Sequence, residues 1–424
     1  MSTPSLSCTG DQAQNHCIWY VSKYVVPITI EGTGGRGYML MRELARMGYQ
    51  SHIITSDSNH LLSTIPILTK NYLFEDLEGV KFCWIRTFKY PIAKSINRIL
   101  SWLHFEWKLW RLPKAMLCQP TVVIISSLSL LTILNGLWFR KIYKCRLIFE
   151  VRDIWPLTLT EEGGLSNWNP LVIILKLIER IGYRFSDAIV GTMPNLREHV
   201  RNVIKKDKLT YCIPMGVELN ENSKIRPISK TYLNNYISTN KFIVAYAGTI
   251  GITNALDTFF DCAESMKGNL DINFLIVGDG ALLSYYKSKY GHLRNLTFVP
   301  KVSKKELQSV LAYCDLLYFS VYKSAVWKYG QSLNKLIDYM LAGKPILASY
   351  TGYKSMINEA GCGTFVPAED TEALRSEIQR YKSMSKKKRD FIGLRGRKWI
   401  LANRNYKDLA AMYLSILFPS RRGL

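Results

Sequence analysis

One stretch of the chain reads GQSLNKLIDYMLAGKP over residues 330–345 and has the pattern of a loop that runs into a helix. Ser332 is of a residue type that caps helix N-termini, and Gly343 followed by Pro345 is typical of a helix end. Apolar residues recur at helical spacing, at Leu333, Leu336, Ile337 and Met340. The stretch therefore predicts a loop, a helix of three turns capped by Ser332, and a sharp stop.

The polar residues of this predicted helix gather on another face. Asn334, Lys335 and Asp338 lie one to four positions apart and are neighbours on the helix surface. The N–H groups of a helix N-terminus and Lys335 suit a phosphate, and Asp338 can accept hydrogen bonds from ribose hydroxyls. We therefore expect a nucleoside diphosphate to bind here. A surface ion pair between Lys335 and Asp338 is the alternative.

Apolar runs alternate with helical stretches through the rest of the chain. The predicted strands are 17–21, 51–55, 121–125, 147–151 and 188–190 in the first half, and 242–246, 273–277, 296–299, 316–319 and 345–348 in the second. This alternation predicts the α/β fold class, with a parallel sheet in each half. For 424 residues we expect two Rossmann-like domains, 1–215 and 216–395, and a helical tail, 396–424, that can pack back on the N-terminal domain.

Composition and cysteine spacing exclude several classes of protein. The chain is 48% hydrophobic and 21% charged, as in a folded soluble protein, and its nine cysteines include no CxxC pair, which argues against a zinc site or a disulfide framework. The first sixteen residues lack the pattern of a signal peptide, so we expect a cytoplasmic protein. Serines and a glycine interrupt the apolar residues 121–139, which predicts a buried strand and then a helix; a membrane-spanning helix is the alternative.

The chain is strongly basic, with 56 Lys and Arg against 33 Asp and Glu and a net charge of +23. Such a surplus attracts phosphates, nucleic acid or an anionic membrane surface, or forms a solvated basic surface. The range Lys94 to Lys114 places Trp102, Trp107 and Trp110 among basic residues, which resembles a helix in a membrane interface; a core helix is the alternative. Because these aromatics sit in an apolar helix, we expect no nucleic-acid partner.

Glycine-rich turns mark the places where a parallel sheet binds anions. Residues 32–37 match GxGxxG, with Asp57 about twenty positions on, but they lie well past the end of the strand. They therefore predict a flexible loop that meets a phosphate, with a structural turn as the alternative. The residues expected to face phosphate in these turns are Gly34, Gly35, Gly248, Thr249, Gly251, Gly278 and Gly280.

The segment 149–156 is a strand that runs into a charged turn. It would bring Arg152 and Asp153 to the ligand edge of the first sheet, unless the two form a buried structural pair. The chain contains no DxD, Walker A, GxSxG or HExxH pattern. A metal-held diphosphate, P-loop phosphotransfer and serine or zinc hydrolysis are therefore unsupported.

Taken in this order, these motifs resemble the retaining glycosyltransferases with the GT-B fold known as family 4. The similarity is greatest to the branch of bacterial surface-polysaccharide assembly that includes N-acetylfucosamine transferases. It covers about residues 17–380 and rests on Gly34-Gly35 and on 149–156, 187–190, 213–217, 278–280 and 332–345.

The resemblance implies an acceptor bound by the first domain, a donor bound mainly by the second, and transfer in the cleft between them with retention. It places Gly35 and Gly251 near the diphosphate, Asp338 near the ribose and Arg152 near the transferred sugar. The sugar pocket would be lined by Gly330, Gln331 and Ser332. No metal and no catalytic base are expected, because the leaving diphosphate assists the incoming hydroxyl.

Two departures from the family pattern concern charge. The usual Glu-x7-Glu pair is replaced by Gly330 and Asp338, and an Arg and a Lys of the second domain's first turn are replaced by Thr249 and Asn254. We therefore expect Lys335 to supply the missing charge and to act in catalysis together with Arg152 and Asp153.

The function expected from this resemblance is transfer of an N-acetylated or deoxy hexosamine from a nucleoside-diphosphate donor. The donor is expected to be UDP-linked, with no other cofactor, and the acceptor to be a polyprenyl-diphosphate-linked glycan of O-antigen, capsule or exopolysaccharide synthesis. The protein would lie on the inner face of the cell membrane through Lys94 to Lys114. A nucleotide-sugar epimerase of the same architecture and a basic nucleic-acid-binding protein are the alternatives.

Overall fold

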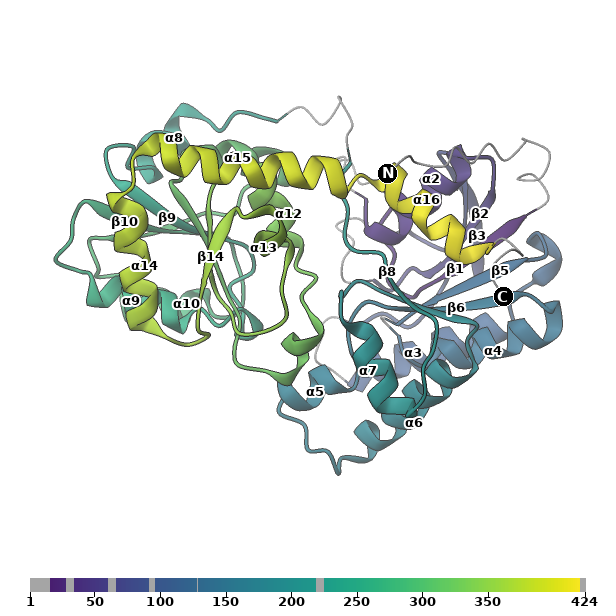
Figure 1. The fold of residues 1–424 in the computed structure, drawn as a ribbon. Coiled ribbons are helices and arrows are strands. Elements are labelled where there is room, and N and C mark those ends of the chain that lie inside the picture. Colours follow the sequence, from purple (N-terminus) through teal and green to yellow (C-terminus); the bar gives the residue numbers. More distant parts are fainter. Residues whose placement is uncertain are drawn as a thin grey trace. The chain divides into compact units, whose positions relative to one another are not determined.

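The computed structural model describes residues 16–27, 34–59, 66–90, 96–127, 129–218 and 225–419. The chain divides into two compact units, one formed by residues 1–214 with 406–424 and the other by residues 215–405. Each unit is a sheet with helices on both faces (Figure 1). The GT-B fold class expected from the sequence is confirmed in its two Rossmann-like sheets.

The first unit has an eight-stranded sheet in the order β3-β4-β2-β1-β5-β6-β7-β8. Its strands are β1 (Cys17–Val21), β2 (Gln50–Ser56), β3 (Tyr72–Leu77), β4 (Val80–Ile85), β5 (Val122–Ser126), β6 (Arg146–Val151), β7 (Ala188–Gly191) and β8 (Thr210–Cys212). All neighbours are parallel except β3 and β4, which form an antiparallel pair. The five predicted strands correspond to β1, β2, β5, β6 and β7, whereas β3, β4 and β8 were not predicted.

Helices cover both faces of this sheet. On one face, α2 (Arg36–Arg46) and α16 (Tyr406–Leu417) share an apolar core with the strands. On the other lie α3 (Ile96–Trp110), α4 (Thr132–Tyr143) and α6 (Pro170–Phe185) (Figure 1). Trp19 of β1 packs against Phe139 of α4, with ring centroids 5.5 Å apart. Two shorter helices, α5 (Leu157–Glu161) and α7 (Leu196–Ile204), complete the unit.

The apolar stretch 121–139 forms β5 and then most of α4, so the predicted strand and helix are confirmed. Its serines fall at the strand end, where Ser127 donates its N–H to the carbonyl of Glu150. Within the part of the chain that the structure describes, no helix combines the length and hydropathy needed to cross a bilayer.

The second unit has a six-stranded parallel sheet in the order β11-β10-β9-β12-β13-β14. Its strands are β9 (Phe242–Ala247), β10 (Ile272–Val277), β11 (Leu296–Val299), β12 (Leu316–Ser320), β13 (Ile346–Ser349) and β14 (Gly363–Val366). Its helices are α8 (Lys230–Tyr236), α9 (Asp257–Ser265), α10 (Leu283–Tyr290), α11 (Lys304–Ala312), α12 (Asn334–Leu341), α13 (Met356–Ala360), α14 (Thr371–Ser383) and α15 (Lys386–Asn403). The sequence predicted every strand of this sheet except β14.

The C-terminal tail starts later than expected. Residue 396, where the tail was predicted to begin, lies inside α15, which packs against α12 and α13 of the second unit. Gly396 allows the close approach of α15, because a Cβ there would lie 2.9 Å from the Cβ of Cys362, just after α13, and 3.7 Å from Cγ of Met340 in α12. The tail that packs on the first unit is α16, which begins at Tyr406.

Candidate functional site

The predicted glycine turns of the second unit meet at the carboxyl ends of β9 and β10. Gly278 has φ +153°, and a Cβ on it would lie 2.0 Å from the carbonyl oxygen of Gly248. Gly280 has φ +154°, and its Cβ would lie 2.3 Å from the carbonyl oxygen of Ile250. Such contacts leave room for no side chain, and the positive φ favours glycine. The turns after β9 and β10 therefore pack directly against each other through their backbones.

The helix predicted from residues 330–345 is α12, but its start differs from the prediction. The N-cap is Leu333, in extended conformation with φ −93° and ψ 121°, so the assignment of Ser332 as the cap was wrong. A leucine side chain has no atom that can accept a hydrogen bond. The N–H groups of the first turn, which begins at Asn334, are therefore left for another acceptor, as anion-binding helices require.

Lys335 reaches from α12 to the first turn after β9. Its Nζ donates to Asn254 Oδ1 at 2.5 Å and to the hydroxyl of Tyr246 at 3.1 Å, and it lies 4.6 Å from the centroid of the Tyr246 ring. Burial lowers the pKa of Lys335 to about 7. These partners are neutral, so the alternative of a surface ion pair with Asp338 is wrong.

The Lys335 side chain also lies against the glycine turn, since its Cε is 3.7 Å from the position that a Cβ on Gly248 would take. Thr249 is held by its carbonyl, which accepts the Tyr246 hydroxyl hydrogen bond at 2.6 Å. The structure thus brings Lys335, Gly248 and Thr249 together around Tyr246. Gly251 follows in the same turn and precedes the short helix Ile252–Asn254.

Two further predicted residues carry polar groups that the fold leaves available. Burial raises the pKa of the Asp338 carboxyl despite the nearby charge of Lys304, and Gln308 donates to the backbone carbonyl of Asp338 rather than to this carboxyl. Gln331 is 7% exposed, and neither polar atom of its amide has a partner among the residues that the structure describes. Buried amides are normally hydrogen-bonded, so this amide is suited to a ligand or a bound water.

The remaining residues of this segment have less defined surroundings. Gly330 takes φ +106° as the chain leaves the short helix Ala325–Tyr329, which glycine permits. Ser332 is partly buried and Asn334 is exposed on the first turn of α12. Tyr246 and Asn254 are site residues that the sequence analysis did not assign to the pocket.

In the first unit, Arg152 and Asp153 lie where β6 ends, as the strand pattern predicted. The backbone of Arg152 is held on both sides, because its N–H donates to Ser127 Oγ and its carbonyl accepts from Thr192 Oγ1. Asp153 is exposed, so it does not form the suggested buried pair with Arg152, although the charge of Arg152 partly offsets the raised pKa of the Asp153 carboxyl. The buried pair of this strand involves Glu150, which precedes them.

Glu150 is fully buried and forms an ion pair with Arg36 of α2, with Nη1 and Oε2 2.5 Å apart. Burial by itself raises the pKa of Glu150, but the Arg36 guanidinium and its hydrogen bonds bring the pKa below the usual value. The hydroxyls of Tyr20 and of Tyr413 in α16 also donate to this carboxylate. Glu150 therefore holds α2, β6 and the C-terminal helix together.

The glycines at the start of α2 are described only in part. Gly34 and Gly35 lie in the described residues, and Gly35 is the N-cap of α2, with its N–H donated to the carbonyl of Val26 at 2.8 Å. Residues 32 and 33 of the predicted phosphate loop lie outside them, as does Lys94 at the start of the predicted membrane segment.

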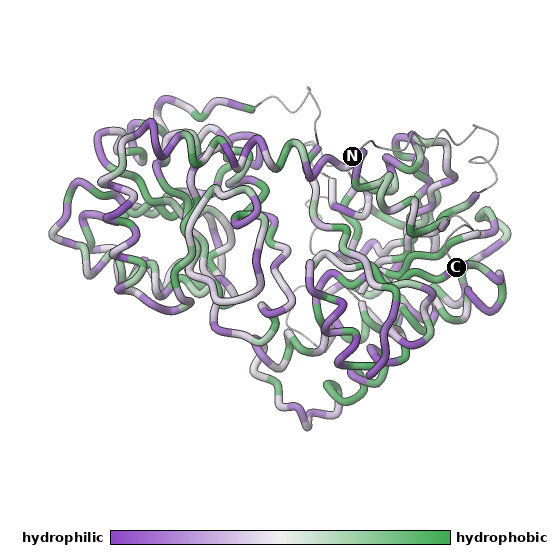
Figure 2. The backbone as a smooth tube through the Cα atoms, viewed as in Figure 1, coloured by the Kyte–Doolittle hydropathy of each residue, from purple (hydrophilic) through white to green (hydrophobic). Residues whose placement is uncertain are grey.

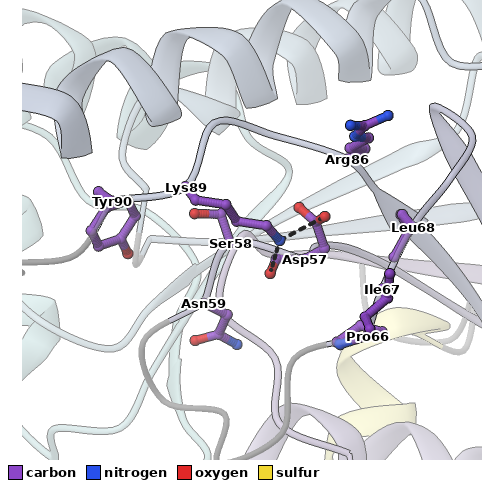
Figure 3. Close-up of a pocket in the computed structure, with 9 residues that line it drawn as sticks. All are labelled: Asp57, Ser58, Asn59, Pro66, Ile67, Leu68, Arg86, Lys89 and Tyr90. Atoms are coloured by element: carbon purple, nitrogen blue, oxygen red, sulfur yellow. Dashed lines mark hydrogen bonds and ion pairs between the residues drawn. The ribbon is translucent and has the colours of Figure 1, made fainter.

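A cavity of about 420 Å³ opens in the first unit where β2 and β4 end (Figure 3). It is lined by Asp57, Ser58, Asn59, Pro66, Ile67, Leu68, Arg86, Lys89 and Tyr90. Lys89 Nζ contacts both the carbonyl and the carboxylate of Asp57 at 2.7 Å. Asp57 is therefore neutralised by a lysine and is not free to bind a ribose, as a dinucleotide site would need.

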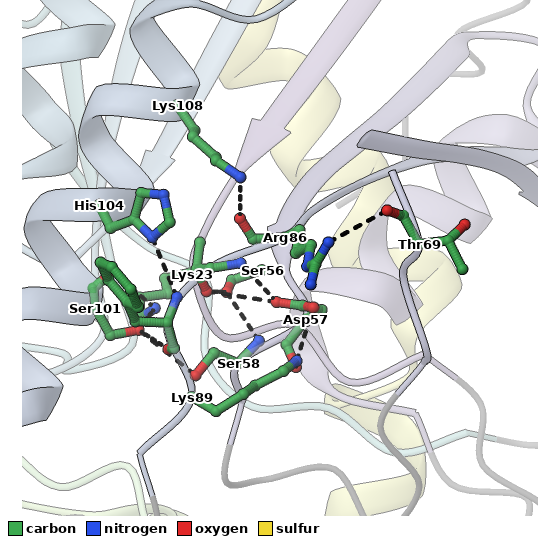
Figure 4. A network of polar contacts seen from close by, with 12 residues as sticks. Lys23, Ser56, Asp57, Ser58, Thr69, Arg86, Lys89, Ser101, His104 and Lys108 are labelled. Carbon is green, nitrogen blue, oxygen red and sulfur yellow. Dashed lines mark hydrogen bonds and ion pairs between the residues drawn. The ribbon is translucent and has the colours of Figure 1, made fainter. Parts of the chain in front are cut away.

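A polar network connects this cavity to α3 (Figure 4). Lys23 Nζ donates to Ser101 Oγ at 2.8 Å, and Lys108 Nζ donates to the carbonyl of Arg86 at 2.7 Å. The backbone N–H of Phe88 donates to His104 Nδ1 at 3.2 Å. The wall of the cavity is thus fixed to the inner side of α3.

Comparison with known proteins agrees with this architecture. Residues 32–221 match the family described as Glycosyltransferase Family 4, and residues 241–383 match the family described as Glycosyl transferases group 1. No curated protein matches the sequence.

Several solved structures share the fold. A sucrose-phosphate synthase from Thermosynechococcus elongatus is 17% identical with TM-score 0.70, over 95% of this chain and 98% of that one. An E. coli structure described as trehalose-6-phosphate bound with UDP-2-fluoro glucose is 12% identical with TM-score 0.71, over 94% and 98%. Anabaena HepE in complex with UDP-glucose is 12% identical with TM-score 0.61, over 94% and 98%. At these identities the similarity concerns the fold, and it does not single out the N-acetylfucosamine transferase branch.

Proposed function

The two matched domains make this chain a glycosyltransferase with a GT-B fold, and we propose that it transfers a sugar from a UDP-linked donor held by the second unit. The observation that carries the proposal is Lys335, a partly buried amine beside a glycine turn and the start of α12, whose hydrogen-bond partners among the described residues are neutral. A buried cation gains most from an anion that replaces the lost water. A diphosphate at this position would meet Lys335, the turn after β9 and the first N–H groups of α12.

In this proposal three side chains of the second unit bind the donor. Lys335 supplies the positive charge that, in the usual family pattern, comes from cations of the turn after β9. Its hydrogen bond to Asn254 holds the Lys335 amine beside that turn. Asp338 accepts from the ribose, and the unpartnered amide of Gln331 binds the sugar. Transfer proceeds with retention and without a metal, so the protein contributes positioning and charge stabilisation. Arg152 and Asp153 are the proposed contributions of the first unit.

We place the acceptor in the cavity of the first unit, beside the Asp57–Lys89 pair. The acceptor is proposed to be a polyprenyl-diphosphate-linked glycan, and the sugar an N-acetylated or deoxy hexosamine of a bacterial surface polysaccharide. Support for a membrane-bound acceptor comes from α3, which exposes Leu103, Trp107 and Trp110 beside Arg111. Its other side buries Phe105 and Leu109, so α3 is both a core helix and an apolar surface.

A panel of UDP-, GDP- and dTDP-sugars tests the donor class by thermal shift. A ligand at 100 times its dissociation constant stabilises its protein by about 2.7 kcal/mol. We expect UDP-sugars to raise the melting temperature by several degrees. Labelled sugar should then leave the nucleotide only when a lipid-linked acceptor is added. Release without an acceptor would favour an epimerase, and no shift with any nucleotide sugar would count against the donor pocket.

The ribose contact is tested by Asp338→Asn. The variant keeps the size of the side chain but loses the anionic acceptor, and a hydrogen bond to a charged group contributes about 1.5–3 kcal/mol. We expect the dissociation constant of UDP, measured by titration calorimetry, to increase about 10- to 100-fold. Asp390→Asn on α15 removes an exposed carboxylate that pairs with Lys386 and serves as the control. Equal UDP affinity in the two variants would exclude Asp338 from the site.

A further inference from the structure

The helices on one face of the first sheet expose apolar side chains on their outer sides. On α3 these are Leu100, Leu103, Trp107 and Trp110, on α4 Leu134 and Ile142, and on α6 Ile173, Ile174, Leu177 and Phe185, with Trp168 just before α6. Leu177 is 58% exposed and Trp168 is 86% exposed. Hydrophobic residues recur along α6 in Figure 2. We call this set the outer face; it extends well beyond the segment Lys94 to Lys114.

The three helices present these residues in one direction. α4 contacts both α3 and α6. Trp110 of α3 and Trp138 of α4 are neighbours, with ring centroids 6.1 Å apart. The inner sides of α4 and α6 pack on the sheet through Phe139 and Tyr183, whose rings contact Trp19 and Phe149. Because the inner sides cover one face of a single sheet, the outer sides point away from it together.

The charged side chains that these three helices expose to solvent are basic. Exposed cations are Lys141 and Lys144 at the end of α4, Lys176, Arg180 and Arg184 on α6, and Arg111 after α3. The acids within the three helices are Glu106 and Glu179. Glu106 accepts from Thr132 and Asn135, and Glu179 is bonded to the ring of His199, so both are used by the fold. The outer face therefore combines apolar side chains with cations.

We propose that the outer face binds an anionic lipid bilayer surface, with α6 and Trp168 lying among the headgroups beside α3. Apolar side chains flanked by Lys and Arg are what an interfacial helix needs, and anionic headgroups neutralise the cations. A second copy of the chain would bring the same cations against each other, because a two-fold interface pairs identical surfaces. Charge therefore favours lipid over self-association.

The inference rests on the proposed function only in assuming that the acceptor is membrane-bound. Its test uses the full chain and vesicles of phosphatidylcholine, either alone or mixed equally with phosphatidylglycerol, with no donor or acceptor present. We expect sedimentation with the mixed vesicles only. The triple variant Ile173→Ser, Ile174→Ser, Leu177→Ser should bind them at least about tenfold more weakly. A failure here leaves the nucleotide-sugar assays unaffected, so the two proposals fail separately.

A control variant and a fluorescence measurement test whether the outer face itself contacts the vesicles. Leu270→Ser with Tyr285→Ser removes exposed apolar side chains of the second unit, and we expect it to bind vesicles like the unaltered protein. Brominated phosphatidylcholine in the mixed vesicles should quench the fluorescence of Trp168. The contribution of Trp168 is identified as the emission that is lost in Trp168→Phe. Unchanged binding by the folded triple variant would overturn the inference. So would equal binding to neutral vesicles, or a dimer in solution that the triple variant disperses.

Discussion

Replacing Lys335 with methionine is expected to reduce turnover of the donor about 100-fold, because removal of one preorganised charge-stabilising donor has an effect of this order. The methionine keeps the apolar stem beside Tyr246 and removes the ammonium. The melting temperature of the unliganded protein should stay equal or rise, since the variant no longer buries an amine whose partners are neutral. Steady-state kinetics and thermal unfolding of the same preparation measure both effects.

The pH dependence of donor binding should identify the same group. The pKa of Lys335 lies at about 7 in the unliganded protein, below the ordinary 10.5. A diphosphate favours the ammonium and raises this pKa, so binding takes up a proton above pH 7. The dissociation constant should therefore increase as the pH rises from 7 toward 9, by at most about tenfold per unit. Lys335→Met should lack this slope.

Stability without ligand changes in the opposite direction with pH. Because the pKa of Lys335 is lower in the folded state, the unfolded chain binds more protons between about pH 7 and 10.5, and the free energy of unfolding rises with pH in that window.

Lys289 provides the matched control for the methionine variant of Lys335, because it lies on the exposed surface, 4.8 Å from the ring of Tyr290. If Lys289→Met and Lys335→Met had the same turnover, the role assigned to Lys335 would be wrong.

Gly278→Ala is expected to lower the free energy of unfolding of the second unit by about 3 kcal/mol. The added methyl group would lie 2.0 Å from the carbonyl oxygen of Gly248, at a φ of +153° that alanine rarely adopts. One of the two turns must therefore move, and both belong to the proposed diphosphate site. Differential scanning calorimetry with and without UDP should show a lower melting temperature and a smaller shift on ligand addition.

Gly268→Ala is the control for this substitution. Nothing lies within 4 Å of the Cβ that it would add. We expect its unfolding and its response to UDP to match those of the unaltered protein. A Gly278→Ala protein as stable as Gly268→Ala would mean that the turns after β9 and β10 are not packed as described.

The fold could be predicted where a buried strand produces a continuous run of apolar residues in the sequence. The strands at the centre of each sheet are continuous apolar runs, and periodicity located them within one or two residues. Three of the missed strands, β3, β8 and β14, lie at sheet edges, whereas β4 is an interior strand that was also missed and the edge strand β11 was predicted. β3 includes Glu75 and Asp76 and lies partly in solvent, and β8 has three residues, so neither differs from a loop in composition.

The contacts of the predicted site residues could not be derived from local spacing. Local spacing placed Lys335 and Asp338 on one ligand-facing helix face, with an ion pair between the two as the alternative. The bond that forms joins Lys335 of α12 to Asn254, 81 positions away in the short helix after β9, and no local pattern encodes a contact between segments so far apart in the sequence. The cap failed for a smaller reason, since Leu333 stays extended and the helix begins one residue later than a Ser332 cap requires.

The return of α16 to the first unit determines the order in which the protein can be completed on the ribosome. Its buried residues Leu409, Tyr413 and Leu417 belong to the same core as β1 and α2, and Tyr413 donates to Glu150. These residues are the last of the described chain to be synthesised, whereas the second unit is one uninterrupted segment that ends at residue 405. The second unit can therefore fold during translation before α16 is made, whereas the core of the first unit, although begun earlier, stays incomplete until α16 has been synthesised.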